Sequence, residues 1–81
     1  MFYVYLIKSP QPGAIYVGYT ENLKRRFAEH QGVPRHKGWR LIYYEAYLDE
    51  EDAPERERML KHYGSGLGRL KQRLERSLSR I

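Results

Sequence analysis

Cysteine is absent from this sequence, which excludes disulfide bonds, thiolate metal sites and a cysteine nucleophile, and which fits a reducing compartment. Long apolar runs are absent as well, and none approaches the ~20 residues that a membrane-spanning helix needs. The first residues, Met1-Phe2-Tyr3, lack the charged start of a secretory signal. We therefore expect a cytoplasmic protein with no membrane partner.

Acidic residues are scarce relative to basic ones. Lys and Arg number 15 and Asp and Glu number 10, so the 81 residues carry a formal net charge of +5. This balance is expected of a protein that meets polyphosphate, but surfaces rich in Arg and Glu also favour solubility and thermal stability, so charge alone does not decide the function. The length predicts a single domain over residues 1–81 with a thin core.

Two short runs of β-branched and aromatic residues open the sequence, at residues 2–7 and 15–20. The segment between them, Ser9-Pro10-Gln11-Pro12-Gly13, indicates a turn because of its prolines and glycine. The pair predicts a β-hairpin. Because side chains alternate along a strand, Tyr5 and Tyr16 can share one face of it.

A helix is predicted next, over residues 22–31, with Thr20 or Asn22 as its N-cap. The positions spaced i, i+3, i+4 and i+7 on its inward face are Leu23, Arg26, Phe27 and His30. A guanidinium and an imidazole thus stand where apolar side chains are expected. Because an isolated buried charge is costly, we expect the end of the stripe with Arg26 and His30 to open into a wet cleft.

The loop at residues 32–40 is punctuated by glycine and proline and is rich in basic groups. Its cations, Arg35, Lys37 and Arg40, suit contacts with a phosphate backbone. Trp39, the only tryptophan, comes directly before the next strand. The Trp39 ring could stack on a base, but we expect it to pack into the hydrophobic core instead.

A third strand is predicted over residues 41–48. Both of its alternating sets of side chains are largely apolar, so we expect it to be covered on both faces. It should pair with the first strand on the side away from the second, which makes the strand of Tyr5 central. The predicted fold class is α+β, a three-stranded sheet flanked by helices in the order β-β-α-β-α-α.

Two helices are predicted after the sheet. The acidic run at residues 49–52 supplies hydrogen-bond acceptors to the N-terminus of the first of these helices. The apolar arc of that helix consists of Met59, Leu60 and Tyr63, and Glu57 lies at the border of the arc. The second helix has one apolar stripe, which consists of Leu67, Leu70, Leu74, Leu78 and Ile81. We expect this stripe to pack on the sheet or on a partner.

The three histidines are His30, His36 and His62. They have no paired spacing and no cysteine beside them, so the sequence disfavours a structural zinc site. His62 is most simply a cation near a helix C-terminus.

The opening of the sequence resembles the GIY-YIG nuclease domain. Tyr3-Val4-Tyr5 matches the first half of the motif and Tyr16-Val17-Gly18 the second, and Arg26 and His30 stand where the family places a helix-borne arginine and a histidine or tyrosine. The resemblance covers nearly the whole chain and is greatest to the small stand-alone bacterial members, similar to the N-terminal incision domain of the excinuclease of DNA repair. It implies the same three-stranded α+β fold.

The resemblance also implies roles for these residues. Tyr16 is the first choice for the general base, with Tyr5 or His30 orienting the water or sharing its proton. Arg26 would bind the scissile phosphate, and Glu57 would be the ligand of one divalent cation, Mg²⁺ with Mn²⁺ as the alternative. Family members often add an asparagine in the closing helix, whereas the only asparagine here is Asn22.

The function expected from these residues is metal-dependent hydrolysis of phosphodiester bonds in DNA, selective for structure or of low sequence specificity. Nucleic acid would be held by Arg25, Arg26, Arg35, Lys37 and Arg40. A protein partner that selects the substrate is compatible with this expectation. The alternatives are a nucleic-acid-binding module with weak or no catalysis and, third, a protein-interaction module, because tyrosines also serve as cross-strand pairs in small sheets.

Overall fold

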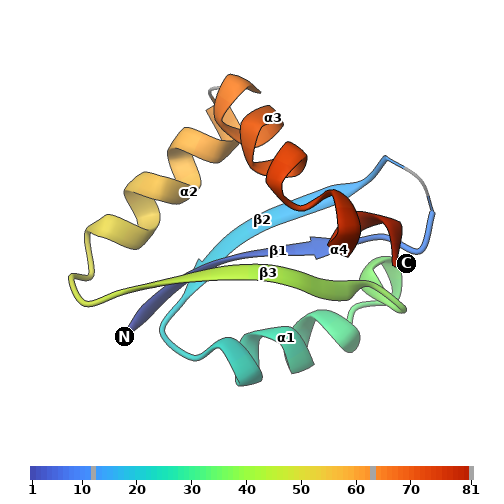
Figure 1. Cartoon of the computed structure of the whole chain (residues 1–81). Coiled ribbons are helices and arrows are strands. Elements are labelled where there is room, and N and C mark those ends of the chain that lie inside the picture. Colours follow the sequence, from blue (N-terminus) through green and yellow to red (C-terminus); the bar gives the residue numbers. More distant parts are fainter. Residues whose placement is uncertain (12, 63, 81) are drawn as a thin grey trace.

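The computed structural model describes residues 1–11, 13–62 and 64–80. Its elements follow one another as β1 (Phe2–Lys8), β2 (Ile15–Thr20), α1 (Leu23–Gln31), the 3-10 helix η1 (Pro34–His36), β3 (Arg40–Tyr47), α2 (Asp52–His62), α3 (Gly64–Arg73) and α4 (Glu75–Ser79) (Figure 1). The predicted α+β class and the three-stranded sheet are confirmed. No helix in the described ranges has the length and apolar character needed to cross a bilayer.

The sheet is antiparallel and has the order β2-β1-β3, so the expectation that the strand of Tyr5 is central is confirmed. Tyr5 lies opposite Gly18 on one side and Tyr44 on the other. The central place of β1 explains why four consecutive residues of this strand, Val4 to Ile7, are buried. Tyr5 is therefore held in the middle of the sheet, with both neighbours fixed by backbone hydrogen bonds.

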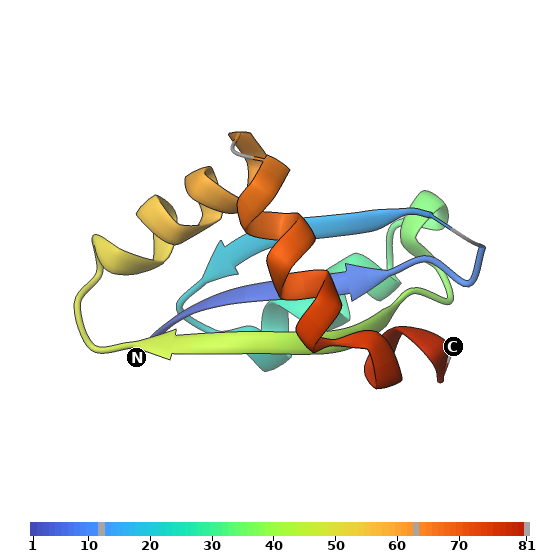
Figure 2. The ribbon, with the colours of Figure 1, turned by 45° about the horizontal axis from the view of Figure 1, so that its top comes forward.

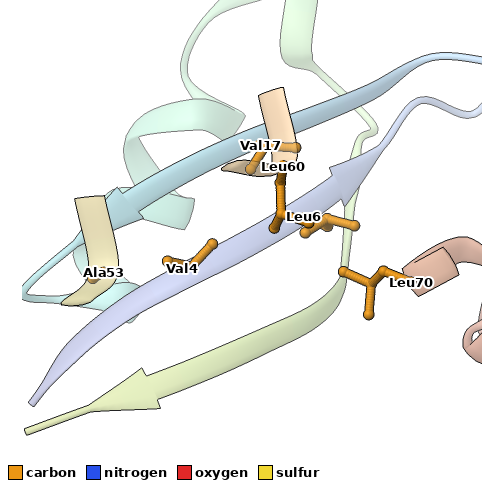
Figure 3. Packing of buried hydrophobic residues seen from close by; sticks show 6 residues of the cluster. All are labelled: Val4, Leu6, Val17, Ala53, Leu60 and Leu70. Atoms are coloured by element: carbon orange, nitrogen blue, oxygen red, sulfur yellow. The ribbon is translucent and has the colours of Figure 1, made fainter. Parts of the chain in front are cut away.

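The two faces of the sheet are covered by different helices. In Figures 1 and 2, α1 lies on one face, whereas α2 and α3 lie on the other. The apolar core is on the α2 and α3 side, where Val4, Leu6, Val17, Ala53, Leu60 and Leu70 pack together (Figure 3). Because alternate residues of a strand point to opposite faces, Tyr3, Tyr5 and Ile7 face α1 instead.

The helix α1 begins as the sequence predicts. The side chain of Asn22 accepts a hydrogen bond from the Arg25 backbone N–H at 3.0 Å, and the Thr20 hydroxyl accepts one from the Asn22 N–H at 3.1 Å. Both candidate caps thus take part, and Gly32 is the C-cap. This fixed start sets the rotation of the helix and brings His30, its one buried residue, against the sheet.

The prediction that the third strand is covered on both faces is wrong. Tyr44 is 52% exposed, because α1 does not cover β3 fully. An open groove of about 460 Å³ remains there, and it is lined by Tyr3, Glu21, Asn22, Leu23, Lys24, Phe27, Leu41 and Tyr44. Trp39 is half-buried and packs its ring against His36, with centroids 4.9 Å apart, so it lies beside an imidazole and not in the apolar core.

A part-buried polar network joins β3 to α2. The guanidinium of Arg56 donates to both oxygens of Glu45, from Nε at 3.0 Å and from Nη2 at 3.1 Å, and the hydroxyls of Tyr43 and Tyr47 donate to the same carboxylate. Burial disfavours the charged carboxylate, but these hydrogen bonds outweigh it and hold the pKa of Glu45 below its ordinary value. The network places an inward-facing charge on an edge strand, a feature that opposes edge-to-edge association.

The C-terminal helices differ from the sequence prediction in two respects. Met59 is 43% exposed, because α2 packs through Ala53 and Leu60, and the third residue of the expected arc, Tyr63, lies outside the described residues. The single last helix is in fact two, since the chain turns tightly at Leu74, whose N–H bonds to the carbonyls of both Leu70 and Lys71. Leu67, Leu70 and Leu74 pack on the core as expected, whereas Ile81 is outside the described part.

Candidate active site

Tyr5 is the centre of the α1 face. Its side chain is 1% exposed, and its hydroxyl lies 2.7 Å from Nε2 of His30. The room for this ring is made by Gly18, because a Cβ at Gly18 would lie 2.6 Å from Cζ of Tyr5 and 3.0 Å from Cε1 of Tyr16. The glycine of the second motif is thus needed for the close approach of two tyrosine rings, and its φ is not positive.

His30 connects β1 to the segment that follows α1. It is 5% exposed, with Nε2 facing Tyr5 and Nδ1 lying 3.0 Å from Nδ1 of His36. The ring of Tyr16 packs edge-on against His30, with centroids 4.9 Å apart. Burial, then the nearby Arg26 and His36, hold the pKa of His30 below its ordinary value, so the neutral imidazole is favoured.

Arg26 lies one helical turn before His30 and supplies the positive charge of the site. Its side chain is 43% exposed and donates from Nη1 to Oε1 of Glu29 at 3.2 Å. Polar contact with the Tyr5 hydroxyl, then the Glu29 carboxylate, raise the pKa of Arg26, so it stays a cation. Burial raises the pKa of Tyr5 above its ordinary value, and Arg26 opposes that rise.

A small pocket of about 150 Å³ opens beside these groups. It is lined by Tyr16, Arg26, Glu29, His30, Val33, Arg35 and His36. Of the predicted nucleic-acid contacts, Arg35 lines this pocket, and Arg25 and Lys37 are exposed on the segments around it. Arg40 is not brought to the pocket, since it lines a separate depression with residues of α4.

Glu57 lies on α2, which covers the opposite face from α1, and it does not line the pocket of Arg26. Its connection to the site runs past the edge strand β2 through Lys61. The Lys61 ammonium is 3.5 Å from Oε2 of Glu57 and 5.5 Å from the centroid of the Tyr16 ring. The structure thus brings Tyr5, Tyr16, Arg26 and His30 together, and it places Glu57 beside them and outside their pocket.

Comparison with known proteins places this arrangement in a family. Residues 1–66 match the family described as the GIY-YIG catalytic domain. The chain belongs to the GIY-YIG family. It is also 37% identical over 68 residues to a protein of Pediococcus acidilactici described as the UPF0213 protein in ldhD 5'region, a match that covers 74% of this chain and 68% of the relative. No solved structure matches the sequence.

A GIY-YIG catalytic domain implies hydrolysis of DNA of the nuclease type in general, so nucleic acid is the substrate class. Three motif residues of this GIY-YIG chain line the pocket, Tyr16 from β2 and Arg26 and His30 from α1. Tyr5 from β1 lies buried behind them against His30, and Gly18 from β2 makes room for its ring.

The residues around Glu57 are compatible with one hard cation. The Glu57 side chain is 19% exposed, so it is partly accessible to solvent. Within the ranges that the structure describes, no group of three His, Cys, Asp or Glu could hold an ion. Mg²⁺ tolerates this, because it binds through one or two carboxylates and keeps waters and substrate phosphates as its other ligands. Lys61 now pairs with the carboxylate and would have to release it.

Sequence reasoning missed three contributors to this GIY-YIG site. The spacing of the histidines indicates no pair, whereas η1 folds His36 back onto His30. Glu29 and Lys61 were not singled out, although their spacings from Arg26 and Glu57 are the i,i+3 and i,i+4 separations at which helical side chains meet. The signal for Glu29 and Lys61 was therefore present, whereas a separation of six residues across a turn gave none for His36.

Proposed function

We propose that this protein is a metal-dependent endonuclease that hydrolyses phosphodiester bonds in DNA, with low sequence specificity or with selectivity for distorted and branched structures. The observation that carries the proposal is one small pocket lined by Tyr16, Arg26 and His30, with Tyr5 bonded to His30 behind it, in a chain of the GIY-YIG family. Hydrolysis needs a base, charge neutralisation at the phosphate and help for the leaving oxygen, and these groups supply the first two.

Arg26 is the proposed phosphate ligand. Its half-exposed guanidinium reaches the pocket while Glu29 occupies only part of its hydrogen-bonding capacity. An incoming phosphate can therefore accept a bidentate contact from Arg26 and compete with Glu29 for it. Arg35 at the same pocket adds a second positive charge.

Tyr16 is the proposed general base, and Tyr5 with His30 shares the proton. A tyrosine hydroxyl has an ordinary pKa of about 10, so a cation nearby is needed to favour its anion. Lys61 lies over the Tyr16 ring, and Arg26 acts on the Tyr5 hydroxyl. Arg26 thus counters the effect of burial on the Tyr5 pKa, and Lys61 supplies a positive charge beside the Tyr16 ring.

Glu57 is the proposed ligand of Mg²⁺, with Mn²⁺ as the alternative. When bound, such a cation would polarise the phosphate and stabilise the leaving oxygen. The argument for Glu57 is its partly exposed side chain and its link to Tyr16 through Lys61.

Low base specificity follows from the size of the chain and the surfaces that it offers. Specific protein–DNA interfaces bury about 1,000–2,500 Å² and place a helix or ribbon in a groove. Here α1 carries the site and α2 and α3 cover the core. The exposed cations Arg25 and Lys37 suit backbone contacts, which carry no base information. A protein partner would then choose the substrate.

The test is a cleavage assay on linear, nicked, flap and branched DNA and on RNA, with Mg²⁺, with Mn²⁺ and with excess chelator. Glu57→Gln should abolish metal-dependent cleavage with little change in DNA affinity, because the shape is kept and the charged ligand is lost. Glu55→Gln is the matched control, since Glu55 lies on the same helix with an exposed side chain. Cleavage that survives in Glu57→Gln or in chelator would contradict the proposal.

A second candidate function is DNA binding with weak or no catalysis. It is favoured by Asn22, the only asparagine, whose side chain is committed to the cap of α1 and so is not the family's closing asparagine. This candidate predicts salt-sensitive DNA binding and no cleavage of any substrate in the panel.

A further inference from the structure

Two histidines, His30 and His36, lie in contact behind Tyr5. The proposed mechanism uses His30 but gives no role to His36. His36 is 8% exposed, and it belongs to η1, where its N–H bonds to the carbonyl of Val33 at 2.9 Å. Its ring packs against Tyr16 and Trp39, with centroid distances of 5.4 and 4.9 Å. These two rings hold the imidazole in place, with its Nδ1 toward His30.

The contact between the two imidazoles constrains their protons. Nδ1 of His30 and Nδ1 of His36 are 3.0 Å apart, and two ring nitrogens make a hydrogen bond only if one carries hydrogen and the other does not. One proton therefore lies between the rings. The other nitrogen of His30, Nε2, is 2.7 Å from the Tyr5 hydroxyl, so the two contacts are linked through a single ring.

The state of His36 then decides the state of Tyr5. With a bare Nδ1 on His36, neutral His30 donates from Nδ1, and its Nε2 accepts the hydrogen of the Tyr5 hydroxyl. With hydrogen on Nδ1 of His36, neutral His30 must carry its own hydrogen on Nε2, and Tyr5 becomes an acceptor. Only the first arrangement directs the Tyr5 proton away from the pocket.

We propose that His36 is a positioning residue of the active site, which fixes the tautomer of His30 and receives, through it, the proton that Tyr5 releases. This inference rests on the proposed nuclease function. In the transfer the O–H bond of Tyr5 breaks as N–H forms at Nε2 of His30, and the N–H at Nδ1 of His30 breaks as N–H forms at Nδ1 of His36. Tyr5 becomes a phenolate, His30 stays neutral, and His36 becomes an imidazolium.

Charged groups face the pair from α1, η1 and α2. Arg26 acts on the Tyr5 hydroxyl and opposes the rise that burial gives to the Tyr5 pKa, and Glu29 lines the same pocket as His36. Arg35 lines the pocket and Lys61 lies over the adjacent Tyr16 ring, and both oppose a second positive charge. The pair therefore accepts one proton and not two, because a doubly protonated pair would also set two N–H groups against each other.

Two variants of His36 separate its roles. His36→Phe keeps a ring against Trp39 and Tyr16 and removes both nitrogens. His36→Asn keeps a hydrogen-bonding atom near the position of Nδ1 but cannot take up a proton. His62→Asn is the matched control, because His62 is exposed at the end of α2. All variants keep Arg26 and Arg35, so DNA affinity should stay within about twofold of wild type.

The first readout is the ¹⁵N spectrum of the His30 ring in the protein without DNA. Wild type should show the neutral ring with hydrogen on Nδ1, His36→Phe should show a loss of that tautomer, and His36→Asn and His62→Asn should retain it. An unchanged His30 spectrum in His36→Phe overturns the proposal. This readout does not depend on cleavage.

The second readout is the pH profile of cleavage. His36→Asn should lower kcat by about 10- to 100-fold, the usual effect of a group that acts through a residue in contact with the reacting groups. It should also remove one inflection from the plot of kcat against pH, while KM stays constant. A profile like that of wild type overturns the proposal, even if His36→Phe does not fold. If wild-type protein cleaves nothing, the nuclease function fails, and the ¹⁵N spectra alone decide whether His36 sets the His30 tautomer.

Discussion

Replacing Gly18 by alanine tests the geometry of the site directly. The added Cβ would lie 2.6 Å from Cζ of Tyr5, whereas carbon atoms in ordinary contact are about 3.5 Å apart or more. The Tyr5 ring or the strand must therefore move by roughly 1 Å. Because the Tyr5 side chain is 1% exposed, the ring cannot swing into solvent, and the movement stretches its 2.7 Å contact with His30.

The expected cost has two parts and one offset. Overpacking a buried site costs about 1–3 kcal/mol, and a lost hydrogen bond at Tyr5 costs about 0.5–1.5 kcal/mol. The offset is the entropy gained by removing a strand glycine, roughly 0.5–1 kcal/mol in favour of alanine. The net loss in free energy of unfolding is about 0.5–4 kcal/mol, or on the order of 2–30 °C in Tm for a domain of this size.

Denaturant unfolding of Gly18→Ala measures this loss, with Gly68→Ala as the matched control. A Cβ at Gly68 meets nothing within 4 Å, and Gly68 is an exposed position inside α3, so alanine there should stabilise by about 0.5–1 kcal/mol. Opposite signs for the two variants are the expected result. If Gly18→Ala is as stable as wild type and leaves the His30 ring spectrum unchanged, the close approach of Tyr5 to β2 is not what requires this glycine.

The remaining predictions concern charge. Arg35→Ala should lower DNA affinity and reduce the slope of log affinity against log salt by about 0.9, the value for one phosphate contact. Arg40→Ala should change this slope less. DNA-binding titrations at several salt concentrations measure both slopes. Glu45 has a pKa held below its ordinary value in the folded protein, so its stabilising effect is present above its unfolded pKa and is lost as pH falls through the folded pKa. Unfolding measured from pH 7 down to pH 2 should therefore show the stability difference between wild type and Glu45→Gln shrinking with acidification, and a constant difference would show that the Arg56 contact does not depend on the ionised carboxylate.

The fold was predictable because local signals agree with the tertiary structure. Pro10 and Gly13 stand between β1 and β2, and the cap at Asn22 starts α1 where the apolar spacing also begins. The same spacing placed Arg26 and His30 toward the sheet, and the structure shows His30 buried and Arg26 at the pocket. Local pattern and tertiary contact coincide here because one short helix carries both.

The errors have one physical origin, which is that burial depends on neighbours remote in sequence. The sequence of residues 41–48 alone does not indicate that α1 leaves Tyr44 exposed beside an open groove. Likewise His36 joins the site only because Pro34 starts a 3-10 turn that reverses the chain toward His30. Helical periodicity placed Glu57 near the core, but it could not say on which side of β2 the carboxylate would lie.

The difference between the two faces of the sheet separates stability from chemistry. On the α2 and α3 side, β1 contributes the aliphatic residues Val4 and Leu6 to a continuous core. On the α1 side the same strand contributes Tyr5 to a chain of hydroxyl and imidazole groups, whose buried polar atoms are satisfied by hydrogen bonds to one another. A thin domain can bury such a polar chain because the other face supplies the hydrophobic free energy. Substitutions of Leu6 should thus act on stability, and substitutions of His36 chiefly on the protons of the site.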